Sequence, residues 1–224
     1  MDVEGRRWET TDEPLERAAE IVARALATSG DAPRLAVGGG SAAQVLGPLR
    51  ARLTRAQWQA LRVTWVDERC VPSDDESSNR GEAYRQGWLG PGAPVGLEVP
   101  LWLDRDTPED AVRRVTQALT DELEGGLDVL LLGMGEDGHV ASLFPGHPAL
   151  DAQGWVTVID DSPKPPARRI TLTMPLLATA RHAVVVATGE GKLSALLRLR
   201  DGDLSLPIAH VPHLTVVTDQ HFAK

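Results

Sequence analysis

Apolar residues in two segments recur at the spacing of an amphipathic helix. In residues 14–29, Ala18, Val22, Ala25 and Leu26 fall on one face, so we expect a helix there. Residues 106–123 have a similar pattern and a clear N-terminal signal, because a threonine precedes Pro-Glu-Asp and those residue types favour the N-cap and first turn. Weaker patterns predict shorter helices at residues 42–53, 80–89 and 193–200.

Short apolar runs between these segments predict buried strands. The runs occupy residues 34–37, 61–66, 127–132, 155–160, 168–174, 182–188 and 213–219. Because strands alternate with helices, the chain is expected to be an α/β protein with a doubly wound, largely parallel sheet and helices on both faces. Neither a low-complexity linker nor a shift in composition divides it, so residues 1–224 are expected to form a single domain.

Ligands of such a sheet bind beyond the carboxyl ends of its strands, where four segments are expected to form neighbouring loops. They are residues 38–41 (GGGS), 67–69 (DER), 133–139 (GMGEDGH) and 189–192 (GEGK). The first lets backbone N–H groups approach an anion, but it lacks the Gly-Lys-Ser/Thr ending of a nucleoside-triphosphate loop. The second and fourth add an arginine and a lysine for a phosphate, and the second also offers carboxylates.

The third segment matches the glycine spacing of a dinucleotide-binding turn. Gly133, Gly135 and Gly138 follow an apolar run, and Asp160 and Asp161 lie where the ribose-binding acid would be sought. Two features oppose this interpretation: a Phe-Pro-Gly breaker soon ends any helix, and the Glu-Asp pair inside the turn would repel a pyrophosphate. The turn therefore needs another explanation.

A histidine directly after the third glycine provides one. His139 would lie at the mouth of the sheet with a side chain that titrates near pH 6.5, so a general acid or base is the better interpretation. Asp137, two residues earlier, is placed to orient the imidazole or stabilise its charge. Because Cys70 is the only cysteine and no His-Glu-x-x-His pattern occurs, we expect no disulfide and no metal site.

The charge of the chain excludes several partners. The 224 residues carry a net charge of -9 and have a pI of about 5.1, which opposes non-specific attraction to nucleic acid or an anionic membrane. The N-terminal segment lacks the apolar run of a signal peptide, and no run approaches the roughly 18 residues of a membrane span. We therefore expect a cytoplasmic protein that binds neither nucleic acid nor a membrane.

Taken together, five segments resemble the 6-phosphogluconolactonase family: GGGS, WVDERCVPSDDESSN, GMGEDGHVASLFP, RRITLTMPLL and TGEGK, in the family's order between about residues 38 and 192. The resemblance implies a Rossmann-like, glucosamine-6-phosphate deaminase-like fold. It also implies hydrolysis of 6-phospho-D-glucono-1,5-lactone to 6-phosphogluconate in the oxidative pentose phosphate pathway, without a cofactor or metal. The expected partner is this small lactone, and the expected state is a monomer, with a dimer as the alternative.

The resemblance also implies residue roles. His139, with Asp137 and Asp67 as the other catalytic candidates, would activate the attacking water and protonate the leaving ring oxygen. The residues implied to hold or line the phosphorylated substrate are Gly39, Gly40, Ser41, Arg69, Arg169 and Lys192. One departure is that GGGSAA stands where the family usually has Ser-Gly-Gly-Ser, then Thr or Ser and Pro.

Two alternatives remain. In a glucosamine-6-phosphate deaminase or isomerase, Asp67 would abstract a sugar proton and His139 would assist ring opening. Such relatives usually have Asp-Glu-Tyr at residues 67–69 and Phe-Asn-Glu-Pro at residues 142–145, and the absence of that glutamate argues against deamination. A non-catalytic sugar-phosphate sensor is the other alternative, although the residues before Pro14 are too few for a helix-turn-helix.

Overall fold

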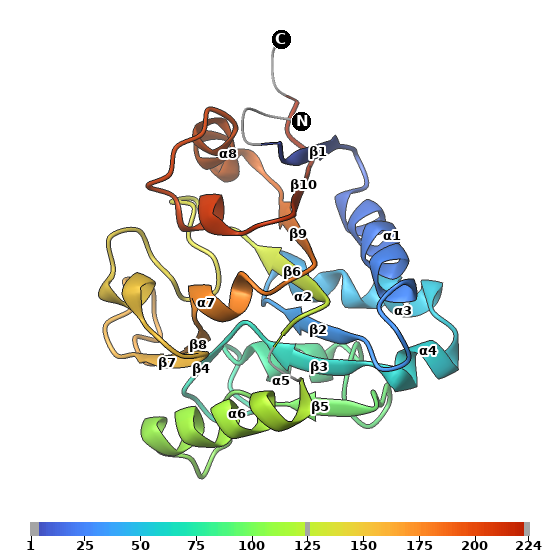
Figure 1. Cartoon of the computed structure of the whole chain (residues 1–224), viewed down its shortest axis with the longest axis vertical. Coiled ribbons are helices and arrows are strands. Elements are labelled where there is room, and N and C mark those ends of the chain that lie inside the picture. The colour runs from blue at the N-terminus through green and yellow to red at the C-terminus, as the bar shows by residue number, and fades with distance from the viewer. Residues whose placement is uncertain (1–4, 124–125, 222–224) are drawn as a thin grey trace.

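A seven-stranded sheet forms the centre of the molecule in the computed structural model, which describes residues 5–123 and 126–221 (Figure 1). Its strand order is β1-β10-β9-β6-β2-β3-β5, and every neighbouring pair is parallel. The strands are β1 (Arg7–Thr10), β2 (Arg34–Val37), β3 (Arg62–Trp65), β5 (Leu97–Val99), β6 (Val129–Gly133), β9 (His182–Ala187) and β10 (Leu214–Thr218). This parallel sheet confirms the predicted α/β fold.

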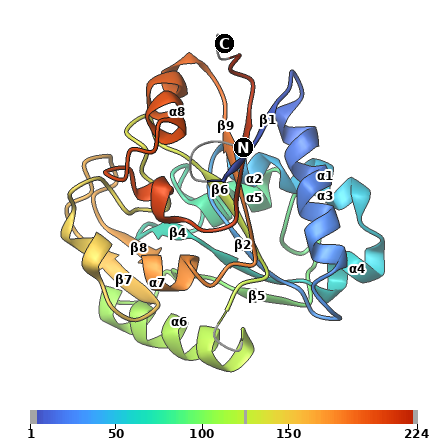
Figure 2. The same cartoon turned by 45° about the horizontal axis from the view of Figure 1, so that its top comes forward.

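Helices cover both sides of the sheet. The α-helices are α1 (Pro14–Ala27), α2 (Ser41–Gln44), α3 (Leu46–Arg52), α4 (Arg55–Ala60), α5 (Asn79–Arg85), α6 (Pro108–Glu122), α7 (Met174–Leu177) and α8 (Leu193–Arg200). Short 3₁₀ helices span Pro148–Asp151, Glu190–Lys192 and Pro207–His210. Figure 2 shows α1, α3 and α4 on one side of the sheet and α6, α7 and α8 on the other, so the sheet is doubly wound as expected.

A second, antiparallel sheet was not predicted. It has the order β4-β8-β7 and consists of β4 (Asp67–Arg69), β7 (Val156–Ile159) and β8 (Arg169–Leu172). The expectation that residues 67–69 form a loop is therefore wrong, because this segment pairs with β8. The connection between β7 and β8 is too short for a parallel crossover, which needs about a dozen residues or more.

Local chain breakers explain the other differences from the expected elements. The single helix expected at residues 42–53 is two helices that meet at Val45, because Pro48 has no N–H to bond the preceding turn. The helix α5 ends before Gly87, whose φ is +69°. The elements β1, β5, α4 and α7 were not expected, since each is too short to show a period.

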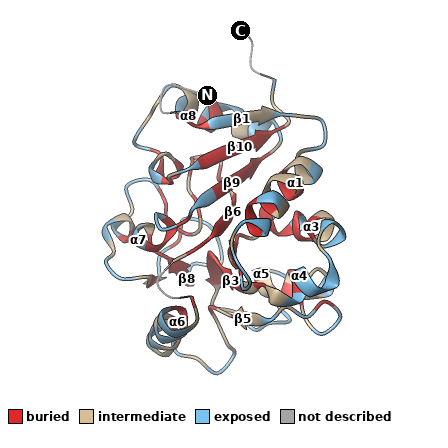
Figure 3. Ribbon diagram, turned by 45° about the vertical axis from the view of Figure 1, so that its right-hand side comes forward, coloured by how far each residue is buried: buried red, intermediate tan, exposed pale blue. Residues whose placement is uncertain are grey.

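The hydrophobic core lies on both faces of the central sheet. Residues 129–132 of β6 are fully buried, and Figure 3 shows buried residues along the strands and the inward helix faces. The predicted face of α1 packs inward, with Ala18 and Val22 fully buried. The expected cap of α6 is confirmed, since Thr107 Oγ1 accepts a hydrogen bond from the Asp110 N–H at 3.1 Å.

Candidate active site

Three of the segments expected to meet follow β2, β6 and β9, and Asp67 follows β3. These four strands are consecutive in the sheet, so their carboxyl ends form one continuous edge. The Gly38 N–H donates to the Leu131 carbonyl at 2.9 Å, and the Ser41 hydroxyl donates to the Val186 carbonyl at 3.0 Å. These bonds join the turn after β2 to its neighbour β6 and to β9, the next strand beyond β6.

The turn after β6 holds His139 and Asp137 as a hydrogen-bonded pair. Nδ1 of His139 lies 2.6 Å from Oδ1 of Asp137. The Gly135 N–H donates to the His139 carbonyl at 2.9 Å, which closes the turn. A Cβ at residue 135 would lie 2.0 Å from His139 Nδ1, so the turn requires glycine there. The glycines of the dinucleotide-like spacing thus make room for an imidazole.

Burial and charge set the protonation of this pair. Burial lowers the pKa of His139 below its usual range, and the hydrogen bond to Asp137 opposes that shift without cancelling it. Partial burial would raise the pKa of Asp137, but the hydrogen bond from His139 outweighs it and leaves that pKa lowered. An ionised Asp137 can only accept a hydrogen bond. Nδ1 of His139 therefore carries the proton at neutral pH, and Nε2 is a free base.

Phe144 packs beside the imidazole, and the turn that carries Lys192 packs against the His139 turn. The ring of Phe144 lies 4.6 Å from the imidazole ring, centroid to centroid, at a tilted angle. Lys192 comes from the 3₁₀ helix after β9, where burial lowers its pKa and the negative charge of Glu136 opposes the shift. A Cβ on Gly191 would lie 2.6 Å from Glu136 Oε1, so the two turns are in close contact.

The glycine turn after β2 presents its backbone to solvent. Gly40 has a φ of +58°, and within the described part of the chain the N–H groups of Gly39 and Gly40 donate to no acceptor. Ala42 and Ala43 are buried, so the residues that depart from the family pattern face the core. This turn offers backbone N–H groups, while the Ser41 hydroxyl proton is already committed to β9.

Arg69 lies at the end of β4 beside the start of α5. One of its guanidinium nitrogens, Nη1, donates to the Ser77 carbonyl. Its Nε is the single buried side-chain nitrogen or oxygen among the described residues without a hydrogen-bond partner. Glu68 serves a different purpose, because its carboxylate accepts the N–H groups of Asn79 and Arg80, both at 2.8 Å. Glu68 thus caps α5, and burial raises its pKa.

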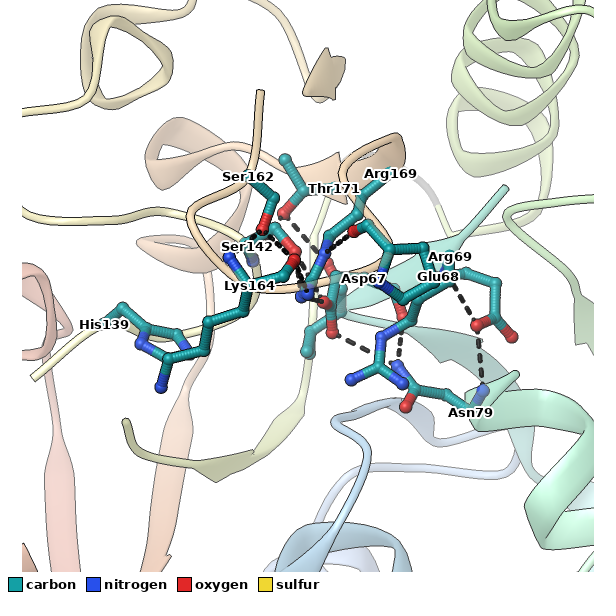
Figure 4. Close-up of polar contacts among 12 residues, drawn as sticks. Asp67, Glu68, Arg69, Asn79, His139, Ser142, Ser162, Lys164, Arg169 and Thr171 are labelled. Atoms are coloured by element: carbon teal, nitrogen blue, oxygen red, sulfur yellow. Dashed lines mark hydrogen bonds and ion pairs between the residues drawn. The ribbon is translucent and has the colours of Figure 1, made fainter. Parts of the chain in front are cut away.

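Asp67 is buried inside a hydrogen-bonded network between the two sheets (Figure 4). Its Oδ2 accepts the Ser142 hydroxyl at 2.6 Å and lies 3.7 Å from Arg169 Nη1. Asn79 Nδ2 donates to the Asp67 carbonyl at 2.9 Å. A Cβ on Gly39 would lie 2.0 Å from Asn79 Oδ1, so the network extends to the glycine turn.

Arg169 fastens the loop between β7 and β8 to this network. Its guanidinium donates to the Lys164 carbonyl at 2.8 Å, the Pro165 carbonyl at 3.3 Å and the Pro166 carbonyl at 3.0 Å. It also donates to the Ser142 hydroxyl at 3.3 Å. Arg169 is 3% exposed, so its N–H groups bond other protein groups and do not face a ligand.

The loop that Arg169 holds carries a cation that the sequence analysis did not single out. The Lys164 side chain extends from the network toward His139 (Figure 4), and its positive charge lowers the pKa of both His139 and Lys192. Lys164 is therefore within electrostatic reach of both predicted site residues. Its setting in DSPKPPA suggested only a loop, although the cation precedes two prolines that restrict the backbone.

Asn79 and Ser142 were also not predicted as site residues. Both contact Asp67, although they lie 12 and 75 residues from it in the sequence. Their only signal was their place inside the segments that carry the family resemblance. Of the predicted site residues, His139 and Asp137 share one turn, and Asp67 and Arg169 share one network. Gly39, Gly40, Ser41 and Lys192 lie on segments at the carboxyl edge of the central sheet, and Arg69 ends β4 of the small sheet.

Within residues 5–123 and 126–221, no three His, Cys, Asp or Glu side chains are grouped as metal ligands. None of the helices described there combines the length and apolar character needed to cross a membrane.

Comparisons with known proteins reveal similar sequences and structures. Residues 7–219 match the family model described as glucosamine-6-phosphate isomerases/6-phosphogluconolactonase. The chain is 39% identical over 207 residues to a 6-phosphogluconolactonase of Rattus norvegicus, covering 86% of this chain and 80% of that protein. It is 34% identical over 205 residues to one of Mycobacterium tuberculosis, covering 86% and 83%. A crystal structure of a 6-phosphogluconolactonase from Shewanella baltica superposes with a TM-score of 0.82 at 26% identity, covering 97% of this chain and 99% of that one.

Proposed function

The chain belongs to the family of glucosamine-6-phosphate isomerases and 6-phosphogluconolactonases, and from this premise we propose that it hydrolyses 6-phospho-D-glucono-1,5-lactone to 6-phosphogluconate. The enzyme is a carboxylic ester hydrolase of sugar-phosphate metabolism. The observation that carries the proposal is the His139–Asp137 pair, with a free imidazole Nε2 at the carboxyl edge of the central sheet, where the Lys192 segment also lies. Arg69 ends β4, the short strand that follows β3. A base beside cations suits an ester that carries a phosphate.

The reaction needs one proton carrier. Nε2 of His139 takes a proton from water, and the resulting hydroxide attacks the lactone carbonyl carbon. The tetrahedral intermediate then breaks its bond to the ring oxygen, and the imidazolium returns the proton to that oxygen. A positioned general base contributes typically about 10² to 10⁴-fold, which suffices for a lactone because this ester is already activated.

The phosphate is held by groups that lack a protein partner. Arg69 is partly exposed, and among the described residues only Nη1 of its guanidinium bonds an acceptor. The N–H groups of Gly39 and Gly40 are free in the described part of the chain. Lys192 adds a second cation. Charge-assisted bonds of this kind are roughly twice as strong as neutral ones. Holding a remote phosphate also fixes the reacting carbonyl against His139.

Lys164 and the buried network complete the proposal. The Lys164 ammonium stabilises the negative charge that develops on the carbonyl oxygen, and its positive charge adds to the burial that lowers the pKa of His139. Asp67 and Arg169 act as positioning residues, because Asp67 is engaged by Ser142 and Arg169 holds the loop that carries Lys164. Ser41 positions the glycine turn through its bond to β9.

The buried Asp67 also bears on the deaminase alternative. That reaction would require the Asp67 carboxylate as the base that abstracts a sugar proton. Here its Oδ2 accepts the Ser142 hydroxyl at 2.6 Å and the side chain is 8% exposed, which supports lactone hydrolysis over deamination. A cytoplasmic location, a single domain and a monomeric state remain predictions from the sequence.

The test generates the lactone in situ by enzymatic oxidation of glucose 6-phosphate and follows its loss against the spontaneous rate. Wild type should accelerate that loss, and His139→Ala should lose at least about 100-fold in kcat. Equal rates for wild type and His139→Ala would refute the assignment. Release of ammonia from glucosamine 6-phosphate would favour the deaminase instead.

A further inference from the structure

A second cavity lies at the opposite edge of the central sheet, where the parallel strands begin. It has a volume of about 770 Å³ and is bounded by α1, β1 and the amino ends of β9 and β10. His182 is the first residue of β9, and His213 immediately precedes β10. The His139 turn follows the carboxyl end of β6. The strands therefore separate this cavity, which we call the amino-edge groove, from the candidate active site.

The amino-edge groove is cationic in a protein of net charge -9. Five arginines and three histidines line it, and Glu9 is the one carboxylate among its lining residues in the described chain. Across the whole chain the balance is the reverse, with 32 acidic against 23 basic residues. The groove therefore has a local charge opposite to that of the rest of the molecule.

Part of this charge is used within the protein. Arg17 lies 3.1 Å from Glu9 and 2.6 Å from Glu20, and Arg24 also pairs with Glu20. Arg6 is buried and donates to the carbonyls of residues 199 and 209. These contacts form the wall of the groove. Glu20 pairs with both Arg17 and Arg24, so one negative charge faces two guanidinium groups.

Other cations keep donors for a ligand. Arg181 Nε lies 3.7 Å from Asp128 Oδ1, but Arg34 already binds both oxygens of that carboxylate at 2.9 Å. The Arg181 side chain is 66% exposed. The single negative charge of Asp128 thus lies near two guanidinium groups, those of Arg34 and Arg181, so this end of the sheet keeps a net positive charge.

Three further cationic or titratable side chains line the groove from neighbouring strands. Arg7, His182 and His213 are exposed, and none of their side chains has a hydrogen bond or ion pair with any other described residue. They come from β1, β9 and the residue before β10, and β10 lies between β1 and β9 in the sheet. Adjacent strands are about 4.8 Å apart, so these side chains fall within the span of one small ligand.

We propose that the amino-edge groove binds a small phosphorylated molecule at a site separate from the active site. Its volume falls within the range of about 300 to 1,000 Å³ that is typical of small-molecule sites. Arginine matches phosphate oxygens in a fork, and histidine adds N–H donors. A small anion experiences the local positive field, whereas an extended polyanion would also meet the negative surface around it. This proposal does not depend on the proposed lactonase activity.

Inorganic pyrophosphate is the probe for the test. Amide and imidazole NMR signals of wild type are followed during its titration at low ionic strength. We expect saturable shifts at Arg7, His182 and His213, and at least a fivefold weaker Kd in the Arg7→Ser/Arg181→Ser double variant. Arg168→Ser, which removes an exposed arginine paired with Asp160, is the matched control and should keep the wild-type Kd.

Lactonase activity serves as the check on folding, since Arg7 and Arg181 lie outside the catalytic machinery and the double variant should keep the wild-type kcat. Shifts confined to residues 38–41, 69 and 189–192 would overturn the proposal, because they would report binding at the active site. Unchanged shifts at His182 and His213 in the double variant would overturn it as well. Saturable binding of a polyglutamate peptide with no response to pyrophosphate would assign the groove to an acidic protein segment instead.

Discussion

Asp137 accepts a hydrogen bond from the imidazole of the residue two positions after it, His139, over 2.6 Å between Oδ1 and Nδ1. This bond fixes the neutral tautomer and points the basic Nε2 away from the carboxylate. Asp137→Asn should therefore lower kcat by about 10 to 100-fold, less than the full contribution of about 10² to 10⁴-fold from a positioned general base, because the imidazole is misoriented and not removed. The lactone assay measures this directly.

A matched pair elsewhere in the chain provides the control. His147 Nε2 lies 2.9 Å from Asp161 Oδ1, outside the proposed machinery. Asp161→Asn should keep the wild-type rate. If Asp137→Asn and Asp161→Asn behave alike, the orienting role of Asp137 is wrong.

The lowered pKa of His139 predicts the pH below which activity falls. The imidazole works as a base only when neutral, and burial keeps it neutral to a pH below its usual 6.5. We therefore expect kcat/KM, after subtraction of the spontaneous rate, to be level near neutrality and to fall as the pH decreases below 6.5. A midpoint above 6.5 would show that another group controls the rate.

Replacement of Lys164 should shift the pH at which kcat/KM falls in acid. Its positive charge lowers the pKa of His139, so Lys164→Met should move the midpoint of kcat/KM toward higher pH and reduce kcat about tenfold through loss of charge stabilisation. The pKa can be read independently from the imidazole NMR signals. Arg168→Met is the control for charge, because this arginine is 59% exposed and paired with Asp160; the midpoint should not move.

Lys192 should affect binding more than the chemical step. If it holds the phosphate, Lys192→Met removes a charge-assisted bond of about 1.5 to 3 kcal/mol, which corresponds to about a 10 to 100-fold higher KM. The unphosphorylated gluconolactone offers the internal control, because its kcat/KM should change little. Equal losses for the two lactones would contradict a phosphate-holding role.

Gly39 should tolerate no side chain. A Cβ there would lie 2.0 Å from Asn79 Oδ1, so Gly39→Ala should displace Asn79 and destabilise the fold by about 1 to 3 kcal/mol. Activity should fall with it, since Asn79 bonds the Asp67 backbone. Urea unfolding measures the stability. Gly92→Ala is the control, because a Cβ at residue 92 meets nothing within 4 Å.

The main sheet could be predicted from sequence because its strands leave a strong signal. The runs at β2, β6 and β9 are apolar except for Arg34 and His182 at the amino ends of β2 and β9, as expected for parallel strands covered on both faces. By contrast, β1 and β5 lie at the sheet edges, and β1 alternates too briefly to stand out. The strand β4 consists of Asp67, Glu68 and Arg69, and such a polar sequence does not predict a strand. Asp67 and Glu68 are nevertheless buried, because hydrogen bonds satisfy both carboxylates.

The site could be predicted where the functional residues lie within one turn of the chain. It could not be predicted where they come from segments that are distant in the sequence. His139 and Asp137 are two residues apart, and glycines mark their turn. Ser142 and Asp67 are 75 residues apart, and both meet Thr171 of β8: Asp67 pairs with it in register, and the Ser142 N–H donates to its hydroxyl. Lys164 reaches the site because Arg169 bonds the carbonyls of its loop, a tertiary contact that residue spacing cannot reveal.

The small antiparallel sheet couples two of the proposed cationic groups. The turns after β2 and β9 belong to the seven-stranded sheet, whereas Arg69 ends β4 and Lys164 lies in the loop between β7 and β8. Arg69 pairs in register with Arg169 of β8, the residue that bonds the carbonyls of the Lys164 loop. A change in the β7–β8 hairpin would therefore reach the proposed phosphate contact of Arg69 as well as Lys164, while the turns after β2 and β9 would keep their own framework.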